Sequence, residues 1–131
     1  MLAIRVAFYG PRSYFFNMHE MSIAVNILDI VKSELAKNDA GELKSIKLKI
    51  GAMTAVEPES LSFCFIAITE GTDMAGVKLD IEEIPIRGRC NNCFTEFELD
   101  RYFSTPCPGC GGSSSELVSG RELDIVSMEV A

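Results

Sequence analysis

Two cysteine pairs constrain this chain more than any other feature of its sequence. Cys90 and Cys93 form the first pair, Cys107 and Cys110 form the second, and thirteen residues separate them. A Cys-x-x-Cys turn can present two thiolates to one metal ion, and two such turns complete a tetrahedral four-sulfur shell. The spacing therefore predicts a small metal-binding unit, which we place at residues 86–121.

The donor set favours zinc. A closed shell of four thiolates is typical of Zn(II) and leaves no position for water or substrate. We therefore expect a structural zinc ion held by Cys90, Cys93, Cys107 and Cys110. Two alternatives stay open. Iron accepts the same tetrahedral sulfur geometry and would colour the protein red, and two disulfides would require an oxidising compartment.

The rest of the chain indicates a reducing compartment. The opening residues have no basic start and no clear cleavage site, and no run of about 18 apolar residues could span a membrane. We expect a cytoplasmic protein whose thiols stay reduced. The fifth cysteine, Cys64, lies in an apolar run and is expected to be buried and inert.

The net charge of −7 argues against binding to nucleic acid. That function needs clustered cations to neutralise phosphates. The metal-binding unit does contain Arg87, Arg89 and Arg101, but it also contains acidic residues. We expect these arginines to offset the negative charge of the four-thiolate site.

Hydrophobic periodicity predicts an α+β fold. Apolar residues at helical spacing predict helices over 21–37 and from Pro58 to about residue 70. Alternating residues predict strands at 45–50, 77–82 and 123–130, and a further strand is expected within 2–9. The expected fold is a small three-stranded sheet with two helices. A zinc-ribbon-like subdomain with two Cys-x-x-Cys knuckles is inserted before the last strand.

The only histidine, His19, precedes the first helix, and its surroundings resemble a known family. The motifs that carry the resemblance are Met18-His19-Glu20-Met21-Ser22, Lys49-Ile50-Gly51-Ala52, Val56-Glu57-Pro58-Glu59-Ser60-Leu61, Phe63-Cys64-Phe65, the two cysteine pairs and Ile125-Val126-Ser127-Met128-Glu129-Val130. Together they are similar to the HypA/HybF family of hydrogenase nickel-incorporation proteins. The resemblance covers residues 18–131.

The resemblance implies a nickel metallochaperone without catalytic turnover. Members of that family deliver nickel to the large subunit precursor of nickel-iron hydrogenase and work with a HypB-type GTPase. Urease maturation proteins are further candidate partners, because some members also support urease. The implied organisation is a nickel-binding α/β domain at 18–85 and 122–131, a zinc-binding domain at 86–121, and an extension at 1–17 outside the core.

The resemblance places nickel at Met18, His19 and Glu20, with Glu57 as a further candidate ligand. In the family the terminal amine, the next backbone nitrogen, its imidazole and the following residue hold the ion. Ni(II) favours such a square-planar nitrogen set. Seventeen residues precede Met18 here. We favour a true start at Met18; otherwise His19, Glu20 and Glu57 would form a weaker oxygen-and-imidazole site.

The cysteine pairs alone also fit a second function. A zinc-ribbon adaptor or nucleic-acid-binding module without nickel transport would carry the same quartet. It would show salt-dependent binding to DNA or RNA, which the acidic composition disfavours.

Overall fold

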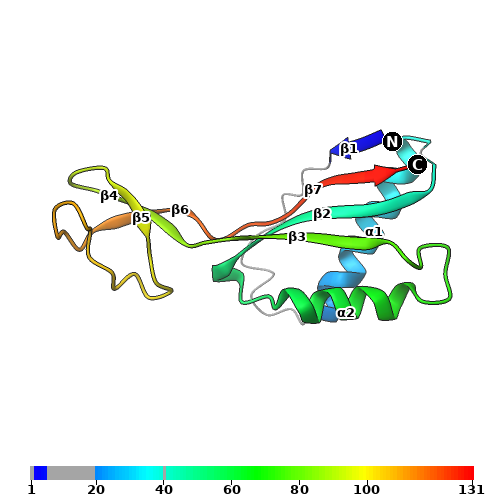
Figure 1. The fold of residues 1–131 in the computed structure, drawn as a ribbon, viewed down its shortest axis with the longest axis horizontal. Helices are drawn as coiled ribbons and strands as arrows, with labels where there is room; N and C mark the ends of the chain where they lie inside the picture. The colour runs from blue at the N-terminus through cyan, green and yellow to red at the C-terminus, as the bar shows by residue number, and fades with distance from the viewer. Residues whose placement is uncertain (1, 6–19, 40) are drawn as a thin grey trace.

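The larger part of the molecule is a four-stranded sheet with two helices. The computed structural model describes residues 2–5, 20–39 and 41–131. The main sheet has the order β1-β7-β2-β3, with β2 and β3 parallel and the other neighbours antiparallel (Figure 1). Its strands are β1 (Leu2–Arg5), β2 (Leu43–Gly51), β3 (Lys78–Ile84) and β7 (Leu123–Val130). The predicted α+β class is confirmed. The sheet has four strands rather than the expected three, because β1, which lies within the strand expected at 2–9, pairs with β7.

The strand β1 belongs to the segment that we predicted to be an extension. It pairs with the C-terminal strand β7, from Leu2 opposite Val130 to Arg5 opposite Ser127. Residues 6–19 lie outside the described part of the chain. The assignment of 1–17 as an extension and the start at Met18 therefore stay predictions.

The helix α1 (Glu20–Lys37) packs an apolar stripe against the sheet. Its buried residues recur at spacings of three and four, which places them on one face of the helix. They are Ile23, Ala24, Ile27 and Val31. Beneath them, β2 alternates buried residues with more exposed ones, because successive side chains of a strand point to opposite faces. Ile46 and Leu48 lie at the centre of this core and are almost completely buried.

The helix α2 (Pro58–Thr69) connects the parallel strands β2 and β3. Pro58 occupies the first turn, where its missing N–H costs no hydrogen bond. Leu61 and Phe65 are buried, and Cys64 and Ile68 pack half-buried against the same core. Cys64 is therefore only partly buried, because it lies at the side of the apolar stripe.

Neither α1 nor α2 is suited to cross a membrane. Within residues 20–39 and 41–131, neither combines the length with the apolar composition that crossing a bilayer requires.

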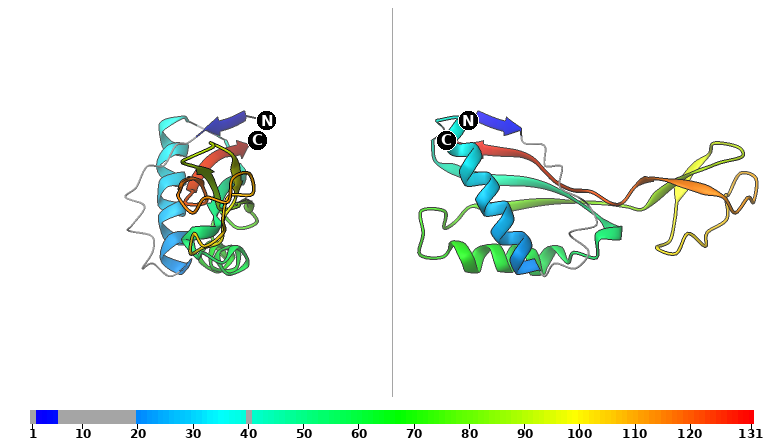
Figure 2. Two further views of the ribbon diagram at one scale, coloured as in Figure 1. Left: turned by 90° about the vertical axis from the view of Figure 1, so that its left-hand side faces the viewer. Right: turned by 180° about the vertical axis from the view of Figure 1, so that it is seen from behind.

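The cysteine-rich segment forms a second, smaller sheet at one end of an elongated molecule (Figures 1 and 2). Its order is β5-β4-β6, and both pairings are antiparallel. The strands are β4 (Arg87–Cys90), β5 (Glu96–Glu98) and β6 (Ser115–Ser119). Its core is small: Ile86, Cys90, Phe97, Leu99 and Cys107. Two of these five residues, Cys90 and Cys107, are cysteines of the predicted metal site, so the small sheet has few apolar side chains in its core.

A backbone crossing joins the two sheets. The N–H of Gly51 donates to the carbonyl of Glu122 at 2.7 Å, and the N–H of Met53 donates to that of Gly120 at 2.8 Å. A Cβ atom on Gly51 would lie 2.1 Å from the Gly120 carbonyl oxygen, so only glycine fits this crossing. Met53, in the 3-10 turn Ala52–Thr54, packs against the core of the smaller sheet.

Candidate metal centre

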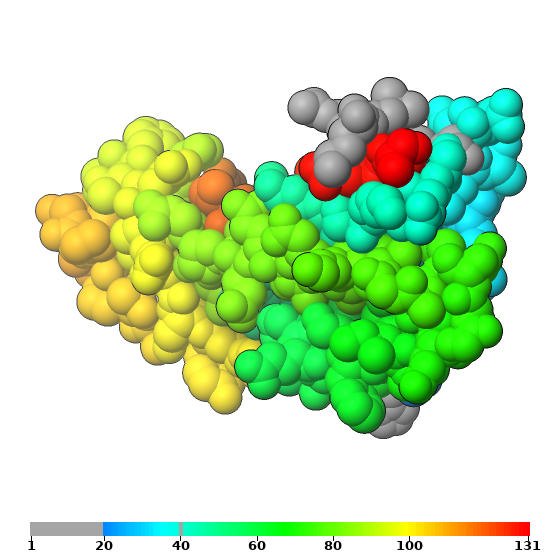
Figure 3. Space-filling view, turned by 45° about the vertical axis from the view of Figure 1, so that its right-hand side comes forward, coloured from blue at the N-terminus to red at the C-terminus, as the bar shows by residue number. Residues whose placement is uncertain are grey.

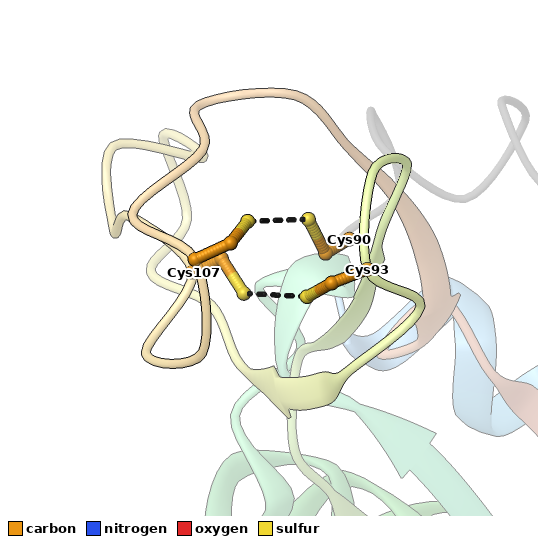
Figure 4. Close-up of side chains that lie close together, drawn as sticks. Cys90, Cys93 and Cys107 are labelled. Atoms are coloured by element: carbon orange, nitrogen blue, oxygen red, sulfur yellow. Dashed lines mark hydrogen bonds between the residues drawn. The ribbon is translucent and has the colours of Figure 1, made fainter.

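The four predicted cysteines converge on one point. The Sγ atoms of Cys90, Cys93, Cys107 and Cys110 all lie within 4.8 Å of one another. Two close contacts join opposite pairs: Cys90 Sγ to Cys110 Sγ at 3.5 Å and Cys93 Sγ to Cys107 Sγ at 3.4 Å (Figure 4). Each pair therefore contributes one sulfur to each close contact. The two turns face each other, as a four-sulfur shell requires.

The two turns repeat the same hydrogen bonds. After Cys90, the N–H of Asn92 donates to Cys90 Sγ at 3.4 Å and the N–H of Phe94 donates to the Cys90 carbonyl at 3.0 Å. After Cys107, Gly109 and Gly111 make the equivalent bonds at 3.3 and 2.8 Å. N–H groups that point at sulfur stabilise a thiolate, so both turns are shaped to carry negative charge.

The fourth residue after each first cysteine has a left-handed backbone. Gly111 adopts φ +73, which glycine accommodates without cost, whereas Phe94 adopts φ +63. A bulky residue in this region is strained. The chain accepts this strain in the first knuckle, where the turn positions Cys93.

The pKa values within the cluster diverge. Hydrogen bonds from the Thr95 hydroxyl and backbone N–H lower the pKa of Cys93 to about 6. Backbone hydrogen bonds from Cys93 and Asn92 lower the pKa of Cys90. A backbone hydrogen bond from Gly112 lowers the pKa of Cys110, but the neighbouring sulfurs of Cys90 and Cys93 raise it more, to about 12. Converging thiolates thus resist loss of the last proton, and a divalent cation would take that proton's place.

The geometry fits a tetrahedral metal shell better than disulfides. A disulfide needs sulfurs about 2.05 Å apart, well below the 3.4 and 3.5 Å found here. Four sulfurs about 2.3 Å from one zinc ion lie about 3.8 Å from one another. The cluster is close to that spacing, and Cys64 takes no part in it.

Two of the three arginines contact groups other than the sulfurs, and their expected role in offsetting the charge of the four-thiolate site stays a prediction. Arg89 pairs with Glu96 at 2.8 Å and Glu116 at 3.6 Å across the small sheet. Arg101 donates to the carbonyl of Ala52 at 3.3 Å and so ties the small sheet to the turn after β2. Both cations contribute to structure through neighbours other than sulfur. The thiolates instead receive backbone N–H groups and a hydroxyl.

Thr95 is a functional residue that the sequence did not lead us to expect. Its hydroxyl lies 3.1 Å from the Sγ of Cys93, the more exposed cysteine of the first knuckle. Its position two residues after the second cysteine of a knuckle was the available signal. A hydroxyl that bonds to a metal-binding thiolate orients the sulfur and tunes its affinity for the ion.

The structure brings two of the four predicted nickel-site residues together. Met18 and His19 lie outside the described residues. Glu20 opens α1, and its Oε1 accepts a hydrogen bond from the N–H of Glu57 at 3.3 Å. The Glu57 side chain accepts from the N–H of Glu59 at 3.2 Å and caps α2. The starts of the two helices are thus joined through these residues.

Comparisons with known proteins identify relatives of this chain. The family model described as "Hydrogenase/urease nickel incorporation, metallochaperone, hypA" matches residues 18–130. The hydrogenase maturation factor HypA of Desulfatibacillum aliphaticivorans is 43% identical over 116 residues, which are 87% of this chain and 88% of that protein. That of Geobacter sulfurreducens is 40% identical over 113 residues, covering 86% and 99%.

Solved structures share the fold at lower identity. The solution structure of the Ni metallochaperone HypA from Helicobacter pylori matches with a TM-score of 0.58 and 21% identity, over 86% of this chain and 97% of that one. A second solution structure of a HypA protein matches with a TM-score of 0.64 at 21% identity, over 88% and 98%. With a family model matched over most of its length, this chain belongs to the HypA family of hydrogenase and urease nickel-incorporation metallochaperones.

Proposed function

We propose that this metallochaperone carries Ni(II) at Met18, His19 and Glu20. A free Met18 amine, the His19 backbone nitrogen and the His19 imidazole form adjoining chelate rings around a square-planar ion. Glu20 supplies the fourth ligand. Such a site is open, so nickel can be passed on, whereas a closed thiolate shell holds its metal.

The Glu20–Glu57 hydrogen bond is the observation that carries this proposal. It holds the first residue of α1 beside the residue that caps α2. Figure 2 shows the first turn of α1 next to α2. Residues 18 and 19 precede that fixed point directly in the chain. The helix N-termini carry partial positive charge, which the carboxylates of Glu20, Glu57 and Glu59 offset. Without those acids, the location would repel a cation.

We further infer that the cysteine cluster holds structural zinc. When bound, zinc supplies four bonds that cross-link the two knuckles and neutralise the thiolates. The buried Cys90 and Cys107 place that cross-link inside the core of the small sheet. The nickel cargo and the resident zinc then occupy separate places, the start of α1 and the small sheet.

The delivery partners follow from the family. We infer that nickel passes to the large subunit precursor of nickel-iron hydrogenase with help from a HypB-type GTPase. Urease maturation proteins are further candidates, because the matching family model covers both enzymes. As a metallochaperone, the protein performs no catalytic turnover, and any energy input comes from the partner.

Nickel binding should weaken in acid. A histidine binds metal only as neutral imidazole, and its ordinary pKa is about 6.5. Below that value a proton on the imidazole competes with nickel, so affinity should fall at least about tenfold per pH unit, and the protons that the amine and the backbone nitrogen release on binding make the fall steeper. Calorimetric titration of a protein starting at Met18, between about pH 5.5 and 7.5, measures this. A flat profile would show that His19 is not a ligand.

Replacing Glu57 with asparagine separates its two candidate roles. Asparagine caps a helix as well as an acid does and keeps the backbone N–H that reaches Glu20. If Glu57 acts by holding Glu20, nickel affinity should stay within about threefold of the parent while the helix remains capped. Nickel titration and thermal unfolding together provide the measurement. A tenfold or greater loss of affinity with unchanged stability would make the Glu57 carboxylate a ligand.

A further inference from the structure

An apolar groove runs between α2 and the edge strand β3. It consists of two adjoining hollows of about 510 and 360 Å³ that share Ser62, Ile66 and Leu79. The two elements lie side by side on one face of the molecule (Figure 3, green and yellow-green). The cysteine cluster and the Glu20–Glu57 hydrogen bond lie outside this surface, and of the acids at the proposed nickel location only Glu59 lines it. Partner binding here therefore does not depend on the proposed nickel site.

The groove exposes large apolar side chains. Phe63 is 72% exposed and Ile66 is 61% exposed, one helical turn apart on α2. Both line the smaller hollow, together with the half-buried Leu79 and Ile81 of β3. Apolar residues that gather beside a hollow, rather than scatter singly, mark an interaction site. Covering them would remove two large side chains from water.

The same surface is acidic. Glu70 lines the larger hollow near the end of α2, and Glu59 lines the smaller hollow near its start. Both carboxylates are exposed. The exposed Asp80 and Glu82 alternate along β3 with the groove-lining Leu79 and Ile81, so they point to the opposite face of the sheet. Lys78 also lines the larger hollow and is the one exposed cation among the residues of α2, its cap Glu70 and β3, so the carboxylates stand at the two ends of the groove. An apolar centre with an acidic rim selects a partner of the opposite charge.

We propose that this groove docks a basic amphipathic helix of another protein. Its apolar stripe covers Phe63 and Ile66 and fills the hollow above Leu79. Glu59 and Glu70 are eleven residues apart, about 16 Å along α2 at 1.5 Å per residue. Lysine or arginine side chains about three turns apart on the docked helix therefore meet both carboxylates.

Charge excludes the other occupants. A second copy of this chain would bring like carboxylates together in an assembly of two −7 chains. Anionic membrane surfaces and nucleic acids would meet the same repulsion. A protein segment with basic flanks is the occupant that matches both the apolar centre and the rim.

A labelled peptide tests the proposal on the full chain. The probe is a fluorescein-labelled helix of roughly 16 residues made only of leucine and lysine, with one apolar stripe. Its control has the same composition in shuffled order, which destroys the stripe. Fluorescence anisotropy measures affinity, and amide hydrogen exchange measures protection along α2 and β3. We expect binding of the ordered peptide, with new protection confined to these two elements.

Matched variants distinguish the groove from general attraction. Phe63→Ala combined with Ile66→Ala should weaken peptide binding about tenfold or more, because both anchors are lost. Val118→Ala removes an exposed apolar side chain on β6 and should change nothing. Glu70→Lys should also weaken binding about tenfold. It places a cation at a helix C-terminus, so it does not threaten the fold. Asp29→Lys is the control: it makes the same charge change on the exposed face of α1, away from the groove, and should weaken binding less than Glu70→Lys.

Three results would overturn the proposal. Equal binding of the shuffled peptide would show that net charge alone explains the interaction. An equal effect of Asp29→Lys and Glu70→Lys would do the same. Concentration-dependent dimerisation in sedimentation velocity, abolished by Phe63→Ala and Ile66→Ala, would assign the groove to a second copy. Nickel titration of each variant keeps these outcomes separate from a failure of the proposed metal site.

Discussion

Replacing Cys107 with alanine should remove zinc and unfold residues 86–121 while the main sheet stays folded. The small sheet has a core of five residues, of which Cys90 and Cys107 are two. A unit with so little apolar core gains much of its folding free energy from metal. Loss of one of four thiolates should lower zinc affinity by about a hundredfold or more. Metal content by mass spectrometry and amide NMR dispersion over residues 86–121 give the measurement.

Cys64→Ala is the matched control for this prediction. Cys64 is a half-buried cysteine on α2 that packs against the main core and takes no part in the cluster. Its replacement should leave one zinc per chain and cost only packing in the main core. A Cys107→Ala protein that keeps a full equivalent of zinc and a folded small sheet would refute a structural role for the cluster. Nickel binding should survive the Cys107 change, because Glu20 and Glu57 are held by α1 and α2.

Replacing His19 with alanine should abolish specific nickel binding in a protein that starts at Met18. The change removes an imidazole ligand and opens one of the chelate rings. The loss should exceed the roughly 10–100-fold that follows when a residue supporting a metal ligand is replaced. Titration of nickel against absorbance or heat measures it, and zinc content should be unaffected. Equal nickel affinity in the parent and the variant would refute the assigned site.

The length of the chain before His19 provides the matched comparison. In a protein that starts at Met1, residue 18 has an amide nitrogen in place of a basic amine. Nickel then has to use His19 with the carboxylates of Glu20 and Glu57, a weaker donor set for Ni(II). We therefore expect lower affinity for the protein starting at Met1 than for the protein starting at Met18. The same affinity in both would show that the amine is not a ligand.

The local spacing of apolar residues was sufficient to predict most of the helices and strands. Residues such as Ile27 and Val31 lie one turn apart, and that spacing determines which face of α1 is buried. Alternation in β2 likewise determines which of its side chains are buried, because successive side chains of a strand point to opposite faces. The strands of the small sheet were not predicted singly. β5 has only three residues, Glu96–Glu98, too few to show a period.

Long-range contacts could not be read from local pattern. The pairing of Leu2–Arg5 with β7 joins residues more than a hundred positions apart, and the hydrogen bond from Glu57 to Glu20 crosses between two helices. The groove at Phe63 and Ile66 likewise depends on where β3 lies beside α2. Arg89 and Arg101 were expected to offset the negative charge of the four-thiolate site, and the partners that they contact were selected by strand register and by the crossing at Gly51.

The sequence by itself determined the four-cysteine cluster, the helices and strands of the main domain, and the family. These depend on short spacings, and the chemistry of two Cys-x-x-Cys turns leaves few alternatives. Only the tertiary structure decided that Glu57 both caps α2 and holds Glu20, and that Thr95 supports Cys93. It also decided that α2 and β3 form a groove with an apolar centre and a carboxylate at each end. The physical reason is that each of these contacts depends on how separate elements pack, which no local period encodes.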